Sequence, residues 1–119
     1  MKNVLIIDDS YEMRKIIIKI IEEVDGLKVV DAAEDIEDSI LSIKKYKPDI
    51  IILDYQLKTG TGIDILKYIR NNKLAIKVIF FSQYNNNVYK SFAMYNGADE
   101  YLVKSINIEN FIDVVKRYI

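Results

Sequence analysis

The chain has 119 residues, carries 17 lysines and arginines against 18 aspartates and glutamates, and contains neither histidine nor cysteine. This length predicts one domain over residues 1–119, which can bury about two-thirds of its unfolded surface without disulfides or structural metals. The net charge of −1 argues against nucleic acid or an anionic membrane as a direct partner of the domain. The missing residue types exclude a thiol nucleophile, a Ser-His-Asp triad and a histidine-liganded zinc site.

Any chemistry therefore has to come from carboxylates, hydroxyls, lysines and backbone groups. No apolar stretch approaches the ~20 residues of a membrane span. Residues 1–3 lead directly into a strand-like segment, without the apolar region of a signal peptide. These features predict a cytoplasmic protein.

Short aliphatic segments alternate with helical patterns along the chain. The segments expected to form strands are Asn3–Ile7, Leu27–Asp31, Ile50–Leu53, Lys77–Phe81 and Glu100–Val103. The first, third and fourth are almost entirely apolar, as strands covered on both faces should be. The sequence therefore favours a parallel sheet between two layers of helices.

Each expected strand is followed by apolar residues that recur every three or four positions, which places them on one face of a helix. In chain order these stripes are Met13, Ile16, Ile17, Ile20, Ile21 and Val24; Ile36, Ile40 and Ile43; Ile63, Leu66 and Ile69; Val88, Phe92 and Tyr95; and Ile108, Phe111, Ile112 and Val115. Pro48 should end the second helix, because proline disfavours the helical conformation of the residue before it. Gly97 is a good left-handed cap for the fourth helix, and Asn107 a plausible N-cap for the fifth.

Strands and helices in this order predict an α/β fold, a doubly wound (βα)5 arrangement. The connections are short enough to permit only right-handed crossovers between parallel strands. The expected five-stranded parallel sheet has strand order 2-1-3-4-5, and its switch point lies between the first and third strands. Ligands bind such sheets at the carboxyl ends of the strands beside the switch point.

Carboxylates stand directly after both strands that flank this point. Asp8 and Asp9 follow the first strand, and Asp54 follows the third, so three negative charges should share one pocket. Two like charges ~4 Å apart cost about 4 kcal/mol at an effective dielectric constant of about 20, so the three acids require cations. Lys104, directly after the fifth strand, supplies one positive charge, and a divalent ion would neutralise the remainder.

Mg²⁺ fits this pocket best, because it takes one or two carboxylates together with waters and phosphate oxygens, and Mn²⁺ could replace it. Calcium is disfavoured because its ligand loop is absent from the sequence. A metal could bridge the acids to a phosphate that they would otherwise repel, and a carboxylate can then form an acyl phosphate. Ser82, which closes the fourth strand, would donate a hydrogen bond to a phosphoryl oxygen, and Lys104 would balance its charge.

With these residues the chain resembles the receiver domains of two-component response regulators, which have a flavodoxin-like fold typified by chemotaxis regulators. The resemblance covers essentially the whole chain. It includes Asp8-Asp9-Ser10 with Met13-Arg14, Gly62 eight residues after Asp54, Ser82, and the run Gly97–Lys104. Each motif alone is weak, but all of them in this order and at these spacings are highly specific.

The resemblance implies that Asp54 is the phosphoacceptor of a phosphorylation-activated signalling switch. It further implies that Asp9, Asp54 and the backbone carbonyl of Gln56 ligate Mg²⁺ directly, whereas Asp8 acts through water. Lys104 would pair with the bound phosphoryl group. Because the chain has no histidine, the donor has to be a sensor histidine kinase, a histidine-containing phosphotransfer protein or a small acyl phosphate.

Tyr101 matches the switch aromatic of the family. Its ring is implied to turn inward as the hydroxyl of Ser82 moves toward the phosphate, which shifts the population between two packings. The face formed by the fourth helix, fifth strand and fifth helix would then bind a downstream effector or output domain, or a second copy of the chain. Tyr89, Lys90 and Tyr95 are candidates for this exposed partner face.

Several positions depart from the family's pattern. Ser105 replaces the proline that normally follows the lysine, often through a cis bond; before a non-proline residue a cis bond costs ~2.5–4 kcal/mol. Lys58 replaces another proline. Gln83 stands where a small residue is usual, and its bulk could narrow access to the phosphoacceptor.

Gln56 and Tyr84 occupy the positions that tune autodephosphorylation in the family by controlling the attacking water. A long Gln56 and a bulky Tyr84 predict a slow phosphatase step.

Two other functions compete with the switch, which would catalyse only its own phosphorylation and dephosphorylation and is not otherwise an enzyme. A Mg²⁺-dependent phosphatase with an aspartyl intermediate would need Asp-x-Asp after the first strand, where Ser10 replaces the second aspartate. A pseudo-receiver scaffold that no longer accepts phosphate is supported only by Gln83 and Ser105, and the intact acids and lysine oppose it.

Overall fold

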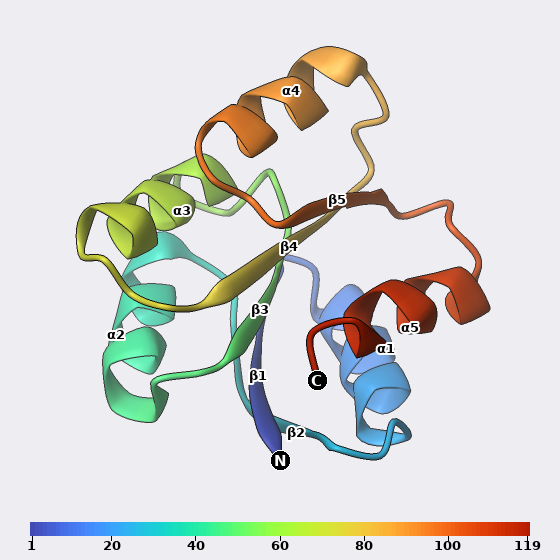
Figure 1. Cartoon of the computed structure of the whole chain (residues 1–119). Coiled ribbons are helices and arrows are strands. Elements are labelled where there is room, and N and C mark those ends of the chain that lie inside the picture. Colours follow the sequence, from blue (N-terminus) through green and yellow to red (C-terminus); the bar gives the residue numbers. More distant parts are fainter.

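The aliphatic segments form a five-stranded parallel sheet with strand order β2-β1-β3-β4-β5 (Figure 1). The computed structural model describes residues 1–119. The strands are β1 Lys2–Ile7, β2 Leu27–Ala33, β3 Ile50–Leu53, β4 Lys77–Ser82 and β5 Glu100–Val103. The helices are α1 Tyr11–Glu22, α2 Ile36–Tyr46, α3 Gly62–Asn71, α4 Asn87–Tyr95 and α5 Ile108–Lys116. The predicted fold and strand order are confirmed, and the predicted strands are found with at most two residues added at an end.

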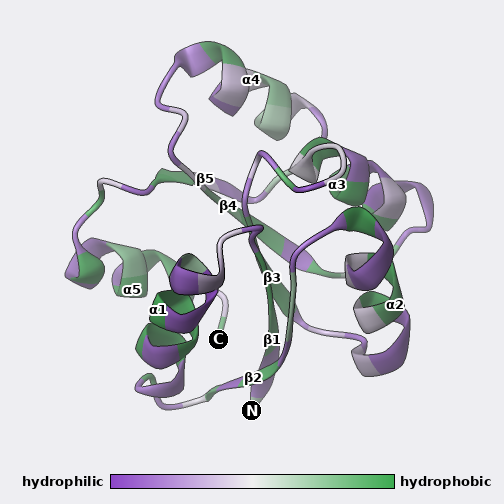
Figure 2. Ribbon diagram, turned by 180° about the vertical axis from the view of Figure 1, so that it is seen from behind, coloured by the Kyte–Doolittle hydropathy of each residue, from purple (hydrophilic) through white to green (hydrophobic).

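Both faces of the sheet are covered by helices, which explains why the central strands are apolar throughout. α1 and α5 cover one face, whereas α2, α3 and α4 lie on the other (Figures 1 and 2). Successive strand residues enter opposite layers, so that Leu5 and Ile7 join the larger core cluster while Val4 and Ile6 join the smaller one. The sheet therefore has no solvated face in its centre, and polar groups collect at the strand ends.

The predicted helix boundaries are set by local backbone chemistry. The side chain of Asn107 accepts a hydrogen bond from the Asn110 N–H and caps α5, as expected. Gly97 has a φ of 101°, the left-handed conformation expected just after α4. α2 ends in a left-handed Lys47 directly before Pro48. None of the helices has the length and apolarity that a membrane span requires.

The predicted apolar stripe of α4 does not face the core. Phe92 is 45% exposed and Tyr95 is 87% exposed, and Val88 is exposed as well. The α4 residue that packs toward the core is instead Ala93, which is fully buried. We call the surface formed by Val88, Phe92 and Tyr95 the α4 outer face. Ile16 of α1 and Ile108 of α5, which the periodicity also placed on buried stripes, are exposed in the same way.

Candidate functional site

The ends of β1 and β3 lie at the same level of the sheet, because Ile7 is paired with Leu53. The next residue of each strand is an aspartate, and the Asp54 N–H donates to the Ile7 carbonyl at 2.8 Å. The Asp8 N–H donates to Ala33 of β2 at 3.0 Å. Backbone hydrogen bonds to neighbouring strands therefore fix the main-chain positions from which both carboxylates project.

Lys104, which directly follows the edge strand β5, reaches across the end of the sheet to these two carboxylates. Its backbone N–H donates to the Ser82 carbonyl at 2.7 Å, which continues the pairing of β5 with β4. Its Nζ lies 2.9 Å from Oδ2 of Asp8 and 3.1 Å from Oδ2 of Asp54. The second oxygen of Asp8 accepts from the Ser10 N–H, and the second oxygen of Asp54 accepts from the Tyr55 N–H at 2.7 Å. The predicted meeting of these three charged side chains is thus seen in the structure.

Burial and neighbouring charges together shift the pKa values of Asp54 and Lys104. Asp8 is 1% exposed and Asp54 is 7% exposed. Burial, together with the negative charge of Asp8, raises the pKa of Asp54 to about 6, although Lys104 acts in the opposite direction. Burial also disfavours the ammonium of Lys104, but its hydrogen bond to Asp8 and the charge of Asp54 prevail and raise the pKa of Lys104. Lys104 is therefore positively charged at neutral pH.

The three aspartates form a cluster with the geometry of a cation site. One carboxylate oxygen from each of Asp8, Asp9 and Asp54 lies within 4.8 Å of the other two. A cavity of about 230 Å³ opens beside them, lined by Asp9, Ser10, Met13, Asp54, Gln56, Gln83, Tyr84 and Lys104. Asp8 does not line this cavity; it is buried and is held by Lys104 and the Ser10 N–H. Hard oxygen donors of this kind suit Mg²⁺.

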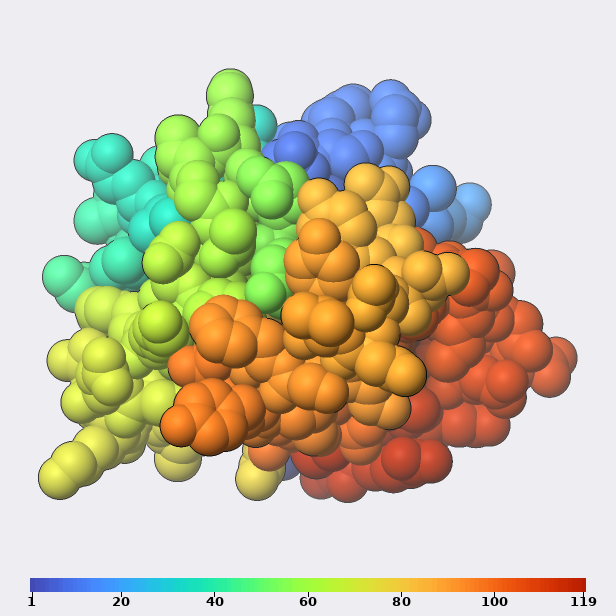
Figure 3. All heavy atoms as spheres, turned by 90° about the horizontal axis from the view of Figure 1, so that it is seen from above, coloured from blue at the N-terminus to red at the C-terminus, as the bar shows by residue number.

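Seen from the carboxyl ends of the strands, the start of α1, the green β3–α3 segment and the gold β4–α4 segment gather on one face (Figure 3). Gln56 comes from the second of these segments, and Gln83 and Tyr84 from the third. All three predicted tuning residues therefore lie at the acidic cavity.

The predicted switch residues meet at Tyr84 and not at the carboxylates. Ser82 is fully buried, and its hydroxyl oxygen accepts from the Tyr84 N–H at 3.0 Å; it does not line the acidic cavity. Tyr101 is buried as well, with its hydroxyl donating to the Tyr84 carbonyl at 2.7 Å and its ring stacked on Phe80. The ring of Tyr101 is therefore turned inward in this structure.

Two of the unusual positions have simple structural outcomes. No peptide bond in the chain is cis, so Lys104 is joined to Ser105 by a trans bond. Lys58 reaches across to Glu34, 3.6 Å away, and Arg14 lies 3.9 Å from the other oxygen of that carboxylate.

Arg14 also donates to the Asp8 carbonyl at 2.8 Å, so it braces the turn that presents the first two aspartates. The sequence motif contained Arg14, but its contact was not predicted.

An aromatic group beside the cavity was also not predicted. Tyr55, Tyr84 and Tyr89 come from three different segments, and each ring contacts the other two. Their sequence positions follow neither a strand nor a helix period, so only the fold brings them together. The signal available in the sequence was the tyrosine directly after Asp54 and the pair that brackets the start of α4.

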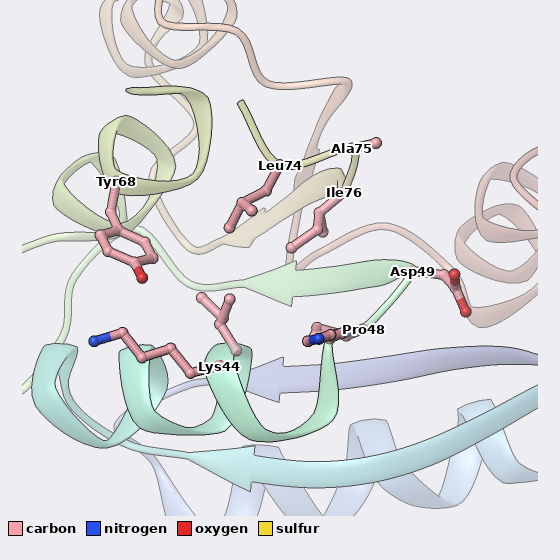
Figure 4. Close-up of a pocket in the computed structure, with 9 residues that line it drawn as sticks. Lys44, Pro48, Asp49, Tyr68, Leu74, Ala75 and Ile76 are labelled. Atoms are coloured by element: carbon pink, nitrogen blue, oxygen red, sulfur yellow. The ribbon is translucent and has the colours of Figure 1, made fainter. Parts of the chain in front are cut away.

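A different hollow of about 400 Å³ lies between α2 and the segment that connects α3 to β4 (Figure 4). Its lining includes Ile43, Tyr68, Leu74 and Ile76, with Lys44 at the edge. Asp49, the only carboxylate in its lining, accepts a hydrogen bond from the backbone of Asn3. This hollow has no group of acids and lies apart from the residues that form the acidic cavity.

Comparisons with known proteins agree with this geometry. The profile of the response regulator receiver domain family matches residues 4–116. A protein-glutamate methylesterase/protein-glutamine glutaminase of Clostridium acetobutylicum is 32% identical over 103 residues, covering 85% of this chain and 30% of that protein. The probable C4-dicarboxylate response regulator DctR of Bacillus subtilis is 30% identical over 115 residues, covering 97% of this chain and 51% of that protein. The chain thus spans about a third to a half of the length of the curated relatives it matches.

Solved structures show the same architecture. The response regulator domain of CheB from Thermotoga maritima superposes with a TM-score of 0.90 at 26% identity, covering 99% of this chain and 96% of that one. A LuxR-family DNA-binding response regulator from Staphylococcus aureus gives a TM-score of 0.93 at 24% identity, covering 99% and 98%, and supports the fold alone. With the family profile matching nearly its full length, the chain belongs to the receiver domains of two-component response regulators.

Proposed function

We propose that this receiver domain is switched by transfer of a phosphoryl group to Asp54. The observation that supports this most directly is the position of its carboxylate. Asp54 is the one aspartate that both contacts Lys104 and lines the acidic cavity, where a donor can reach it. Asp8 contacts the lysine but does not line the cavity, and Asp9 lines the cavity but is exposed and has no contact with Lys104.

The charges indicate how a metal would be held. Three carboxylates and one ammonium sum to 1 − 3 = −2 when all are ionised, which one divalent ion neutralises. Asp9, Asp54 and the backbone carbonyl of Gln56 would hold Mg²⁺, or Mn²⁺ in its place, because these residues line the cavity. Asp8, already paired with Lys104, would act through water. When bound, the ion screens the negative charge that develops on the transferred phosphoryl oxygens.

The transfer balances without another reactant. An oxygen of Asp54 attacks the phosphorus of a phosphohistidine or small acyl phosphate, a P–O bond forms, and the donor's bond to phosphorus breaks with its electron pair leaving on the donor. Lys104 then pairs with a phosphoryl oxygen in place of the carboxylate, and the Ser82 hydroxyl donates a hydrogen bond to another. In the dephosphorylation step, water attacks the phosphorus, the bond between phosphorus and the Asp54 oxygen breaks, and inorganic phosphate leaves as the carboxylate is restored. The domain catalyses only these two steps on itself.

Gln56 and Tyr84 support a slow return step. An attacking water has to approach the phosphorus opposite the Asp54 oxygen, which means through the acidic cavity, and both residues line that cavity. A Gln56→Ala, Tyr84→Ala double variant should lose its phosphoryl group faster than the wild type. An unchanged half-life would exclude these side chains as barriers.

The partners follow from the same assignment. A sensor histidine kinase or a histidine-containing phosphotransfer protein would donate the phosphoryl group. The α4 outer face, with β5 and α5 beside it, would bind an effector, an output domain or a second copy of the chain, because it exposes three large apolar side chains on one helix.

Intact mass spectrometry tests the proposal. The protein is incubated with acetyl phosphate and Mg²⁺, and we expect one added phosphoryl group. Asp54→Asn and EDTA should each abolish it, whereas Asp113→Asn, a change at an exposed acid on α5, should not. No adduct from acetyl phosphate or a phosphorylated kinase would favour a scaffold. Steady turnover of phosphate esters would favour a phosphatase.

A further inference from the structure

Tyr84 is held at both its backbone and its ring. Its N–H donates to the Ser82 hydroxyl oxygen at 3.0 Å, and its carbonyl accepts from the Tyr101 hydroxyl at 2.7 Å. Its ring stacks on Tyr89 with the centroids 4.5 Å apart and the planes 21° apart. The edge of the Tyr55 ring completes the contact at 5.8 Å. The two backbone hydrogen bonds fix the main chain of Tyr84, and the aromatic contacts hold its ring.

The ring position matters because Tyr84 lines the acidic cavity. Any water that reaches a phosphoryl group on Asp54 has to pass the residues that line that cavity. A ring held against Tyr89 stays in one place. A ring released from this contact would sample other rotamers and expose the path for part of the time.

We propose that Tyr89 is a positioning residue for the phosphoryl site, acting through the ring of Tyr84. This inference rests on the proposed function of Asp54. Tyr89 touches no acid and does not line the cavity, yet its ring stacks on Tyr84 and meets Tyr55 edge-on at 5.1 Å. Tyr55 directly follows the phosphoacceptor, so the aromatic group contacts the site from two sides.

The position of Tyr89 in α4 gives the contact a second consequence. α4 carries the α4 outer face, and Val88 of that face is the preceding residue. The stack of Tyr89 on Tyr84 therefore joins the helix expected to bind partners to the side chain that limits water access. A movement of α4 would therefore change the position of the Tyr84 ring at the cavity through this pair.

The experiment measures the half-life of the phosphorylated protein by intact mass in a double-mutant cycle. Tyr89→Leu keeps an apolar side chain but removes the stack, and it should shorten the half-life roughly two- to tenfold, the range that loss of an aromatic pair provides. Tyr89→Phe keeps the ring and should have the same half-life as the wild type. Met94→Leu, a change at an exposed apolar side chain on the same helix that belongs neither to the cavity nor to the α4 outer face, should have no effect.

The cycle also separates positioning from a general weakening of the fold. In a Tyr84→Ala background the Tyr89→Leu change should no longer matter, because the ring that it positions is absent. Additive effects, or an unchanged half-life in Tyr89→Leu, would overturn the inference.

A second measurement does not depend on phosphorylation. Proton NMR of the unmodified protein should show ring contacts between Tyr84 and Tyr89, and a shifted Tyr84 ring environment in Tyr89→Leu but not in Tyr89→Phe. If the wild type takes no phosphoryl group, the proposed function fails, whereas an unmoved Tyr84 ring in Tyr89→Leu overturns the positioning role by itself.

Discussion

The ammonium of Lys104 lies 3.1 Å from the carboxylate of Asp54, although 50 positions separate the two residues in the chain. The contact exists because β5 and β3 both pair with β4 and all three run in the same direction. It holds the acid in place at the end of β3. The same lysine also lies 2.9 Å from Asp8, so one positive charge compensates two buried negative charges.

Removing this charge should destabilise the fold. Lys104→Met leaves two buried carboxylates without their ammonium, and breaking such a group costs roughly 3 kcal/mol. The loss should be greatest near neutral pH and shrink in acid, where Asp54, with a pKa of about 6 even beside the lysine, becomes protonated. Urea unfolding across pH provides the measurement, with the exposed Lys45→Met as control. A loss that does not change with pH would contradict this account.

Replacing Asp54 should have the opposite effect when metal is absent. The pKa of this carboxyl is raised by burial and by Asp8 from 3.8 to about 6, so folding favours its protonated form. The resulting stability is fully present below about pH 4 and is lost as the pH rises through about 6.

In EDTA, Asp54→Asn should therefore be more stable than the wild type near neutral pH by roughly 2 kcal/mol, and the difference should vanish in acid. Thermal unfolding at several pH values measures it. Added Mg²⁺ should raise the melting temperature of the wild type more than that of the variant, because the ionised carboxylate becomes a ligand. Equal shifts would argue against Asp54 as a ligand.

The acids of the site could be predicted from the sequence because they depend on two general rules. Asp8, Asp9 and Asp54 stand at strand ends, and the strand order of an open parallel sheet brings those ends together. The aromatic group of Tyr55, Tyr84 and Tyr89 depends instead on how two loops and a helix pack, which no local period encodes. Sequence reasoning therefore finds the charged residues and misses the neighbours that hold Tyr84.

The α4 outer face shows a second limit. Periodicity finds apolar residues on one side of a helix but does not say whether that side meets the sheet. In α4 the core side is occupied by Ala93, which leaves Phe92 45% exposed, whereas the same reasoning correctly buried Phe111 of α5, which is 2% exposed.

Matched substitutions of these two phenylalanines test the difference. Phe111→Ala removes a ring packed against Phe81 at 4.7 Å and should cost about 3–5 kcal/mol of unfolding free energy. Phe92→Ala removes a ring that solvent already reaches, and should cost less than about 1 kcal/mol. Urea unfolding of both variants gives the comparison. Similar losses would mean that the apolar side of α4 contributes to the core.

Gly62 is required for the close approach of α3 to the backbone of Asp54. Its N–H donates to the Tyr55 carbonyl at 2.6 Å, and a Cβ at this position would collide with the backbone oxygen of Asp54. The same Cβ would lie 3.0 Å from Leu53 and from Phe80. Since backbone cannot yield as a flexible side chain can, Asp54 itself has to shift.

We expect Gly62→Ala to lose about 1–3 kcal/mol of stability. It should also lower the rate of phosphorylation by acetyl phosphate, measured by intact mass under conditions where the variant is folded. Thr59→Ala, an exposed change in the same loop, serves as control. A variant with wild-type stability and rate would show that the loop accommodates a side chain.

Arg70 joins α3 to β4 and β5 at the opposite end of the sheet. Its guanidinium donates to the Gly97 carbonyl at 2.9 Å, to the Ile76 carbonyl at 2.8 Å and to Asp99 at 3.0 Å.

Three bonds in fixed directions require the planar fork of arginine, which lysine does not provide. Arg70→Lys should therefore lose roughly 2 kcal/mol, because one ammonium cannot reach all three acceptors and some of them are left without a donor. Arg117, which is mostly exposed and lies 3.6 Å from Glu100, is the matched control, and Arg117→Lys should change stability by less than about 1 kcal/mol. Equal losses in urea unfolding would show that charge alone, and not the directions of the three bonds, explains the contribution of Arg70.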